Sequence, residues 1–262
     1  MTSKNCFCRL VMGCTTVLFL AACGGDGGGG GGGGGGDATT ITKEATLTLG
    51  QEVPPAIPPQ LPANPIEGTM TVTLTTASNA ISGTLTLTGD FPRVTAAHIH
   101  DGDVGVAGGV VIGLLGTGNT LSIPPGTVLT AAQAARFKAG GYYVNAHTAL
   151  NAAGEIRGQL IGFADNIQPL FTANCAVSGC HVTGGSAPMS LASGVSVGNL
   201  VNQPAIIPFG GVTRVIPFNS ADSVLFSRIS DPSASRMPPD RQLPANEQNL
   251  IKVWIDMGAK NN

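Results

Sequence analysis

The sequence predicts two folded parts, an antiparallel β sandwich or barrel followed by a small all-α domain. Apolar and polar residues alternate at period two in short segments between residues 41 and 161, which is typical of strands with one buried face. After residue 162 the apolar residues follow helical spacing instead. Charged residues are only 11% of the chain and 38 of 262 residues are glycine, a composition that favours an exported, loop-rich protein.

The first 22 residues are predicted to be a secretory signal peptide. Lys4 and Arg9 precede an apolar stretch, residues 10–22, that is shorter than the roughly 20 residues needed to span a bilayer. The stretch runs into LAAC (residues 20–23), which resembles the lipobox of bacterial lipoproteins and implies acylation of Cys23 after cleavage. We therefore expect a lipoprotein at the outer membrane or cell surface, on the periplasmic or extracellular side. An ordinary signal peptide with an incidental cysteine is the alternative.

Residues 23–40 are predicted to be a flexible tether between this lipid anchor and the folded part. Glycine is unbroken from residue 27 to residue 36. Glycine has the most backbone entropy to lose on folding and no side chain to bury, so such a run behaves as a flexible linker.

The elements of the β domain follow from three alternating segments, 46–49 (TLTL), 70–74 (MTVTL) and 81–87 (ISGTLTL), which are predicted strands. Residues 54–65 are too rich in proline for a central strand and are expected to form an extended surface loop. Residues 129–139 (LTAAQAARFKA) are predicted to form a short helix, for which Thr130 is a suitable N-cap.

Three of the four histidines, His98, His100 and His147, fall in this β domain. Side chains alternate along a strand, so His98 and His100 share one face while Ala97 and Ile99 share the other. We expect the apolar pair to face the core and the three imidazoles to lie on outward faces. If the two strands are neighbours, the imidazoles converge on a site suited to Zn or Cu.

Glu155 is a candidate for a fourth ligand at this metal site. It follows a turn at Gly154 and either completes the set or pairs with Arg157. The alternative to a metal site is that the histidines only form hydrogen bonds with neighbouring backbone and carboxylate groups.

Four segments of this region resemble the motifs of the CHRD domain: residues 49–55 (LGQEVPP), 97–100 (AHIH), 143–148 (YVNAHT) and 154–158 (GEIRG). The resemblance implies an immunoglobulin-like β sandwich or barrel over residues 41–161. It implies no particular biochemical activity, because none is established for that family.

Helical spacing predicts three helices in the remainder, residues 163–262. The first ends at Cys175, the second covers residues 220–229, and the third begins with Asn246 as N-cap and ends at Gly258. Leu250, Trp254 and Met257 form an apolar stripe on the third helix, and this predicts that they pack in a core.

The segment NCAVSGCH (residues 174–181) carries the pattern of a c-type haem attachment site. Two cysteines form thioethers to such a haem, and the histidine after the second is an axial ligand of the iron. Of six cysteines, three lie in the predicted signal peptide and Cys23 would carry lipid, which leaves Cys175 and Cys180, followed by His181. Four residues separate the two cysteines instead of the usual two. A disulfide loop, or a zinc site that lacks an evident fourth ligand, is the alternative.

A methionine is the expected sixth ligand of the iron, because this part of the chain holds no second histidine. Met237 lies in a proline-braced segment and is the first choice, Met189 is the second, and Met257 is expected in the core. Residues 167–171 (IQPLF), 175–181 (CAVSGCH), 236–239 (RMPP) and 254–259 (WIDMGA) resemble the small cytochrome c-like domains of bacterial exported proteins. The resemblance implies one covalent haem c and electron transfer with an unidentified redox partner.

The sequence gives no support to nucleic-acid binding or to catalysis. The net charge is -2, and we find no basic run and no aromatic stacking platform. There is no Ser/His/Asp order, paired acidic dyad or phosphate-binding loop, so the sequence favours an electron-transfer protein over a catalyst. A redox-inert cell-surface binding or structural module with a disulfide between Cys175 and Cys180 is the alternative function.

Overall fold

The computed structural model describes residues 39–56, 65–206, 211–233 and 235–262 of the chain. The predicted signal peptide, Cys23 and nearly all of the glycine tether lie outside the described residues, as does most of the proline-rich segment 54–65. Within the described ranges, every helix is too short or too polar to cross a bilayer.

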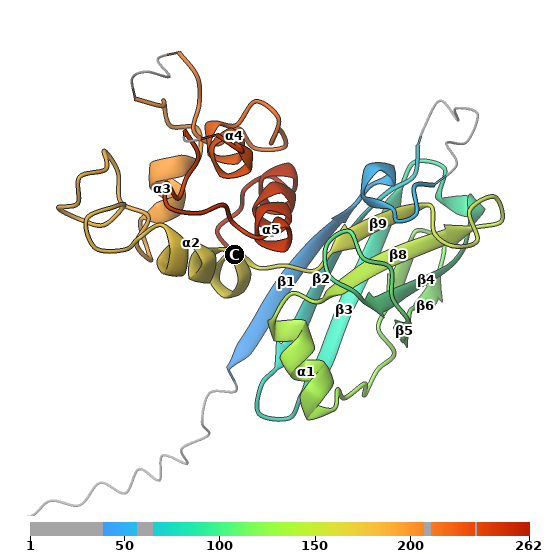
Figure 1. The fold of residues 1–262 in the computed structure, drawn as a ribbon. Coiled ribbons are helices and arrows are strands. Elements are labelled where there is room, and N and C mark those ends of the chain that lie inside the picture. The colour runs from blue at the N-terminus through green and yellow to red at the C-terminus, as the bar shows by residue number, and fades with distance from the viewer. Residues whose placement is uncertain (1–38, 57–64, 207–210, 234) are drawn as a thin grey trace, which may run out of the picture. The chain divides into compact units, whose positions relative to one another are not determined.

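Residues 40–159 form two antiparallel β-sheets (Figure 1). The strands are β1 (Thr40–Leu47), β2 (Glu67–Thr75), β3 (Ala80–Thr88), β4 (Val94–Asp101), β5 (Val110–Gly113), β6 (Leu115–Thr117), β7 (Thr120–Ser122), β8 (Tyr142–Thr148) and β9 (Ile156–Gln159). One sheet has the order β1-β2-β3-β7-β6 and the other has the order β5-β4-β8-β9. Short 3-10 helices, η1 (Leu49–Gln51) and η2 (Phe91–Arg93), follow β1 and precede β4.

The two sheets are joined along one side by hydrogen bonds between β1 and the segment around β9. The Glu44 amide donates to the Ile161 carbonyl and the Thr48 amide donates to the Arg157 carbonyl, each at 3.0 Å. These bonds satisfy backbone groups that a free sheet edge would leave exposed. The architecture is therefore a sandwich that is closed along one side, which confirms the β sandwich or barrel expected from the alternating segments.

The core of this β domain contains the apolar residues of the predicted strands. In β2 every second residue from Gly68 to Leu74 is buried, and Met70, Val72 and Leu74 belong to one hydrophobic cluster. Burial of such side chains is the main favourable term in folding, at about 25 cal/mol per Å² of apolar surface. The segment 46–49 is only partly strand, because β1 ends at Leu47 and η1 begins at Leu49.

Helix α1 (Ala131–Lys138) begins where the sequence predicts it, with Thr130 as N-cap. The Gln133 amide donates to Thr130 Oγ1 at 3.2 Å, and the Thr130 amide donates to Gln133 Oε1 at 2.9 Å. This reciprocal capping box satisfies two backbone donors that would otherwise lack partners at a helix start. Phe137 and Ala134 bury the inner face of the helix in the core of the β domain.

The C-terminal part contains short helices around a second hydrophobic core (Figure 1). They are a π-helical turn, η3 (Phe163–Ile167), and the helices α2 (Gln168–Asn174), α3 (Ser196–Leu200), α4 (Val224–Ser230) and α5 (Ala245–Asp256). Phe163, Phe171 and Trp254 pack together with ring centroids 5.2 to 6.1 Å apart. The helices are few and small, long loops connect them, and α3 is an element that the sequence did not predict.

Helix boundaries in this part differ from the predicted ones. The first predicted helix is divided between η3 and α2, and α4 begins at Val224 instead of residue 220. The N-cap of α5 is Pro244 and not Asn246. The Pro244 carbonyl accepts the amides of Glu247 and Gln248, so the chain enters the helix before Asn246. Trp254 and Met257 are buried, as predicted.

Replacing Thr130 with alanine should lower the free energy of unfolding by about 1 kcal/mol, because the N-cap oxygen of α1 is lost. Urea denaturation followed by circular dichroism measures the change. Thr130→Ser keeps the acceptor and should stay close to the wild type. Equal stability of the alanine and serine variants would show that the capping box contributes nothing.

Candidate functional site

Three histidines of the β domain lie together because β4 and β8 are neighbouring strands (Figure 1). Ala96 pairs with His147 and His98 pairs with Asn145, so His98 and His147 lie diagonally across the ladder. One ring nitrogen from each of His98, His100 and His147 lies within 4.8 Å of the others. We call this set the histidine cluster. Ala97 and Ile99 belong to the core on the opposite face, as predicted.

Backbone carbonyls orient two rings of the histidine cluster. His100 Nδ1 lies 3.0 Å from the Gly108 carbonyl oxygen and His147 Nδ1 lies 3.1 Å from the Ala152 carbonyl oxygen. A carbonyl only accepts hydrogen bonds, so both Nδ1 atoms carry the proton and both Nε2 atoms keep a lone pair. His98 Nδ1 then donates to His147 Nε2 at 3.0 Å.

The sheet face that carries these histidines lies opposite the core, as expected, but two of the three histidines on it are buried. His100 is 7% exposed and His147 is 9% exposed. The loops that supply the Gly108 and Ala152 carbonyls cover the face. Burial lowers the pKa of both His100 and His147 below the ordinary value, more than their hydrogen bonds to carbonyls raise it. Both imidazoles are therefore neutral at neutral pH, the form in which histidine binds metals.

An aromatic ring and a buried cation lie beside the histidine cluster. The Tyr143 ring stacks on His100 with centroids 5.0 Å apart, and the Arg157 guanidinium lies 3.5 Å from the centroid of Tyr143. Arg157 Nη2 also donates to the Asp103 carbonyl at 2.8 Å. The stacked residues form one side of the cluster and restrict how the His100 ring can turn.

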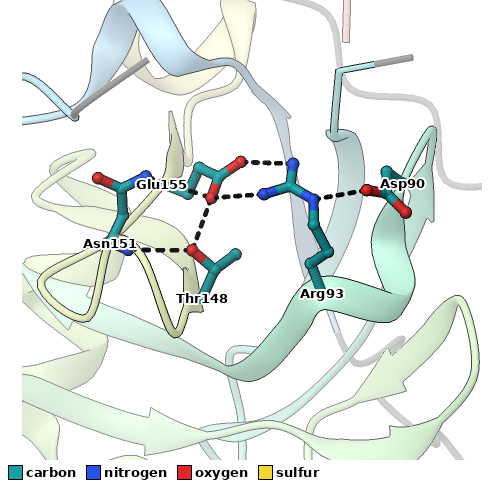
Figure 2. Close-up of polar contacts among 5 residues, drawn as sticks. All are labelled: Asp90, Arg93, Thr148, Asn151 and Glu155. Carbon is teal, nitrogen blue, oxygen red and sulfur yellow. Dashed lines mark hydrogen bonds and ion pairs between the residues drawn. The ribbon is translucent and has the colours of Figure 1, made fainter. Parts of the chain in front are cut away.

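Glu155 does not join the histidine cluster, and it does not pair with Arg157. Its carboxylate accepts hydrogen bonds from Arg93 Nη2 at 2.9 Å, Thr148 Oγ1 at 2.6 Å and Asn151 Nδ2 at 3.2 Å. Figure 2 shows this carboxylate facing the Arg93 guanidinium, which also contacts Asp90. Burial alone would raise the pKa of Glu155, but these hydrogen bonds outweigh it and lower the pKa below its ordinary value.

A cavity of about 860 Å³ lies in the C-terminal part. Its lining includes Cys175, Cys180, His181, Met189 and Met237, which are the residues that the sequence singled out for the haem site. Cofactor pockets commonly measure about 300–1,000 Å³. The structure thus brings residues more than 60 positions apart in the sequence to one concave surface.

The loop between the two cysteines is a compact turn. The Cys180 amide donates to the Val177 carbonyl at 2.9 Å, and the His181 amide donates to the Cys175 carbonyl at 3.1 Å. Gly179 has a φ of 79°, a value that other residues rarely adopt. Four intervening residues are therefore accommodated by a hydrogen-bonded turn, and both cysteine side chains remain at the cavity.

His181 and Cys175 are partly buried. His181 Nδ1 lies 3.2 Å from the Met189 carbonyl oxygen, so this nitrogen carries the proton and Nε2 keeps its lone pair. Burial is the main cause that lowers the pKa of His181, and burial raises the pKa of Cys175 to about 11. Cys175 and Cys180 are both free thiols and are not joined by a disulfide.

Sequence reasoning missed several residues at both sites. Arg214, Arg228 and Arg241 line the cavity, but arginines scattered along a chain give no signal that they meet. The period-two spacing places Tyr143 on the β8 face of His147, but its stacking on His100 was not predicted. The carbonyls of Gly108 and Ala152 carry no sequence signal, because every residue has one.

Comparison with known proteins supports the CHRD prediction. The sequence model of the CHRD domain matches residues 43–160, which contain the histidine cluster and Glu155. No curated protein and no solved structure matches the chain. The CHRD domain predicted from the four sequence motifs is thereby confirmed for this segment.

Replacing Glu155 with glutamine should lower the free energy of unfolding at pH 7 by about 1–3 kcal/mol, because a buried charged acceptor is lost. The folded-state pKa lies below the ordinary value of 4.5, so the carboxylate stabilises the fold above that value. The difference between variant and wild type should shrink as the pH falls through the folded-state pKa.

Urea denaturation between pH 3 and pH 7 measures this difference. Glu67→Gln is the matched control, since Glu67 is exposed at the start of β2, and it should change stability by less than about 0.5 kcal/mol. A Glu155→Gln effect that does not vary with pH would contradict the assignment of a buried, ionised carboxylate.

Proposed function

We propose that residues 163–262 bind one covalent c-type haem and transfer electrons, in an exported protein that Cys23 anchors to the membrane through lipid. One observation carries the proposal: two free cysteines, the histidine after the second cysteine, and a distant methionine line the same large cavity. The CHRD domain is then a separate module of the same exported chain.

The chemistry of the cavity fits a haem. Apolar residues such as Leu191, Leu200 and Ile229 line it and suit a large, flat, apolar ring. Arg214 and Arg241 also line the cavity, and guanidinium groups pair well with carboxylates such as the haem propionates. When bound, haem supplies an iron centre that takes up and releases one electron at a time.

His181 is suited to the role of the proximal ligand because a hydrogen bond fixes the orientation of its ring. The Met189 carbonyl accepts the proton on Nδ1, which fixes the ring and leaves Nε2 as the ligand atom. The low pKa that burial gives His181 keeps this nitrogen unprotonated at neutral pH. The compact turn of residues 175–181 places both cysteines beside His181.

Met237 is the better candidate for the second axial ligand. The backbone of Met189 already contacts His181, so this methionine belongs to the His181 side of the site. Met237 belongs to the loop after α4, its amide donates to the Arg228 carbonyl at 2.8 Å, and its side chain is 37% exposed beside the cavity. Thioether ligation raises the reduction potential into the range of electron-transfer cytochromes.

The free thiols bear on the alternative of a redox-inert module with a disulfide. A thiol must ionise before it attacks another sulfur, and the pKa of about 11 at Cys175 makes its thiolate rare at neutral pH. Cys175 is therefore a poor attacking group for disulfide formation at neutral pH.

The full chain, expressed with a c-type cytochrome maturation system, should retain one haem after denaturing electrophoresis and show a Soret band. The double variant Cys175→Ser/Cys180→Ser should lose the covalent haem stain, because no thioether can form. Absence of haem in the wild type under these conditions, with a mass lower by two hydrogens, would establish the disulfide alternative instead.

In the haem-loaded protein, Met237→Ala should lower the reduction potential, because the thioether ligand is lost. Redox titration followed by visible absorption measures the shift, and the band from methionine-to-iron charge transfer should disappear with it. Met189→Ala is the matched control and should keep both signals. The reverse result, with loss only in Met189→Ala, would identify Met189 as the ligand.

A further inference from the structure

We infer that His98, His100 and His147 form a binding site for one divalent transition-metal ion, Zn²⁺ or Cu²⁺. The site lies in the CHRD domain and is separate from the cavity proposed to hold haem. Imidazole nitrogen is a preferred ligand of both ions, and three protein ligands with one position left for water are a common zinc arrangement.

The distances between the three rings suit a single ion. Nitrogens bound to one ion at about 2.0–2.1 Å lie no more than about 4.2 Å apart. The three ligand nitrogens of the histidine cluster already lie within 4.8 Å of one another, and His98 Nδ1 is 3.0 Å from His147 Nε2. Side-chain movements of less than about 1 Å therefore bring all three into coordination.

Two of the rings are oriented as in established metal sites. Histidine ligands generally donate the proton of their other ring nitrogen to a carbonyl or carboxylate, which fixes the ring and its tautomer. His100 and His147 both do so, toward the Gly108 and Ala152 carbonyls. Their Nε2 lone pairs are the ligand atoms that remain. The Tyr143 ring stacks on His100 and further restricts the rotation of the His100 ring.

One ring nitrogen of the histidine cluster lacks a hydrogen-bond partner in the protein. Six buried side-chain nitrogen or oxygen atoms of the described residues have no such partner, and His100 Nε2 is the one within the cluster. A purely structural role accounts for the two carbonyl contacts and for the contact between His98 and His147, but it leaves this acceptor unsatisfied. Buried polar atoms are nearly always paired, so an unpaired one needs an explanation. A metal ion bound to the three rings pairs it.

Metal binding requires only a change of tautomer at His98. In the metal-free protein, His98 Nδ1 donates its proton to His147 Nε2. On binding, that hydrogen bond is broken, the proton on His98 moves to Nε2 by exchange with solvent, and Nδ1 becomes the third ligand. This exchange moves the proton within the His98 ring and leaves the number of protons unchanged. Glu155 takes no part, because Arg93, Thr148 and Asn151 occupy its carboxylate.

The experiment is a metal titration of the full chain after chelator treatment and dialysis. Isothermal titration calorimetry with Zn²⁺ or Cu²⁺ should give one ion per chain, and the Cu²⁺ form should show imidazole nitrogen couplings in electron paramagnetic resonance. His98→Ala and His147→Ala should each weaken binding by more than about 100-fold, since loss of outer-shell partners alone costs about 10- to 100-fold.

Two controls separate this site from the C-terminal part. His181→Ala removes the remaining histidine, and Cys175→Ser/Cys180→Ser removes the two free thiols of the C-terminal part. Both variants should still bind one ion per chain, which places the ion outside that part. His98→Ala is the most informative variant, because His98 is the least buried of the three and its circular dichroism melt shows whether it folds.

Two outcomes would overturn the inference. One is that the wild type binds no stoichiometric Zn²⁺ or Cu²⁺. The other is that folded His98→Ala binds as tightly as the wild type while the cysteine variant does not. Both results are independent of haem loading, so the haem proposal and the metal proposal can fail separately.

Discussion

The pairing of β4 with β8 is the constraint on which the β domain depends. Their register places Ala97 and Ile99 in the core and turns His98 and His100 to the other face, where His147 approaches from the neighbouring strand. A shift by one residue would reverse both faces, because side chains alternate along a strand. The same ladder therefore specifies the hydrophobic core and the histidine cluster.

Burial of the polar face of this sheet has a cost that hydrogen bonds offset. Glu155, Arg157 and Asn145 are all almost fully buried, and an unpaired charge at such a position strongly destabilises a fold. Glu155 is paired by three neighbouring side chains, and Arg157 lies on an aromatic ring and donates to a carbonyl. Asn145 Oδ1, Arg157 Nη1 and His100 Nε2 have no hydrogen-bond partner within this network, and His100 Nε2 is the one that belongs to the histidine cluster.

The C-terminal part differs from the β domain in how completely its core is filled. Its small core leaves a cavity of about 860 Å³ beside α2 and α4, where a compact domain would ordinarily be filled to crystal-like density. A space of this size, lined by thiols, an imidazole and thioethers, is unlike the closed core of the β domain. The haem that we propose for this cavity would account for both its size and its lining.

Local spacing was enough to predict the strands β2 and β3, the capped helix α1, the CHRD motifs, and the run of Cys175, Cys180 and His181. Period-two and helical patterns are read directly from neighbouring residues, so no knowledge of packing is needed. The folded structure was needed to show that His100 and His147 are buried, that Glu155 pairs with Arg93, and that three arginines line the cavity. These features arise from contacts between residues far apart in the chain and from backbone carbonyls, and neither leaves a pattern in the sequence.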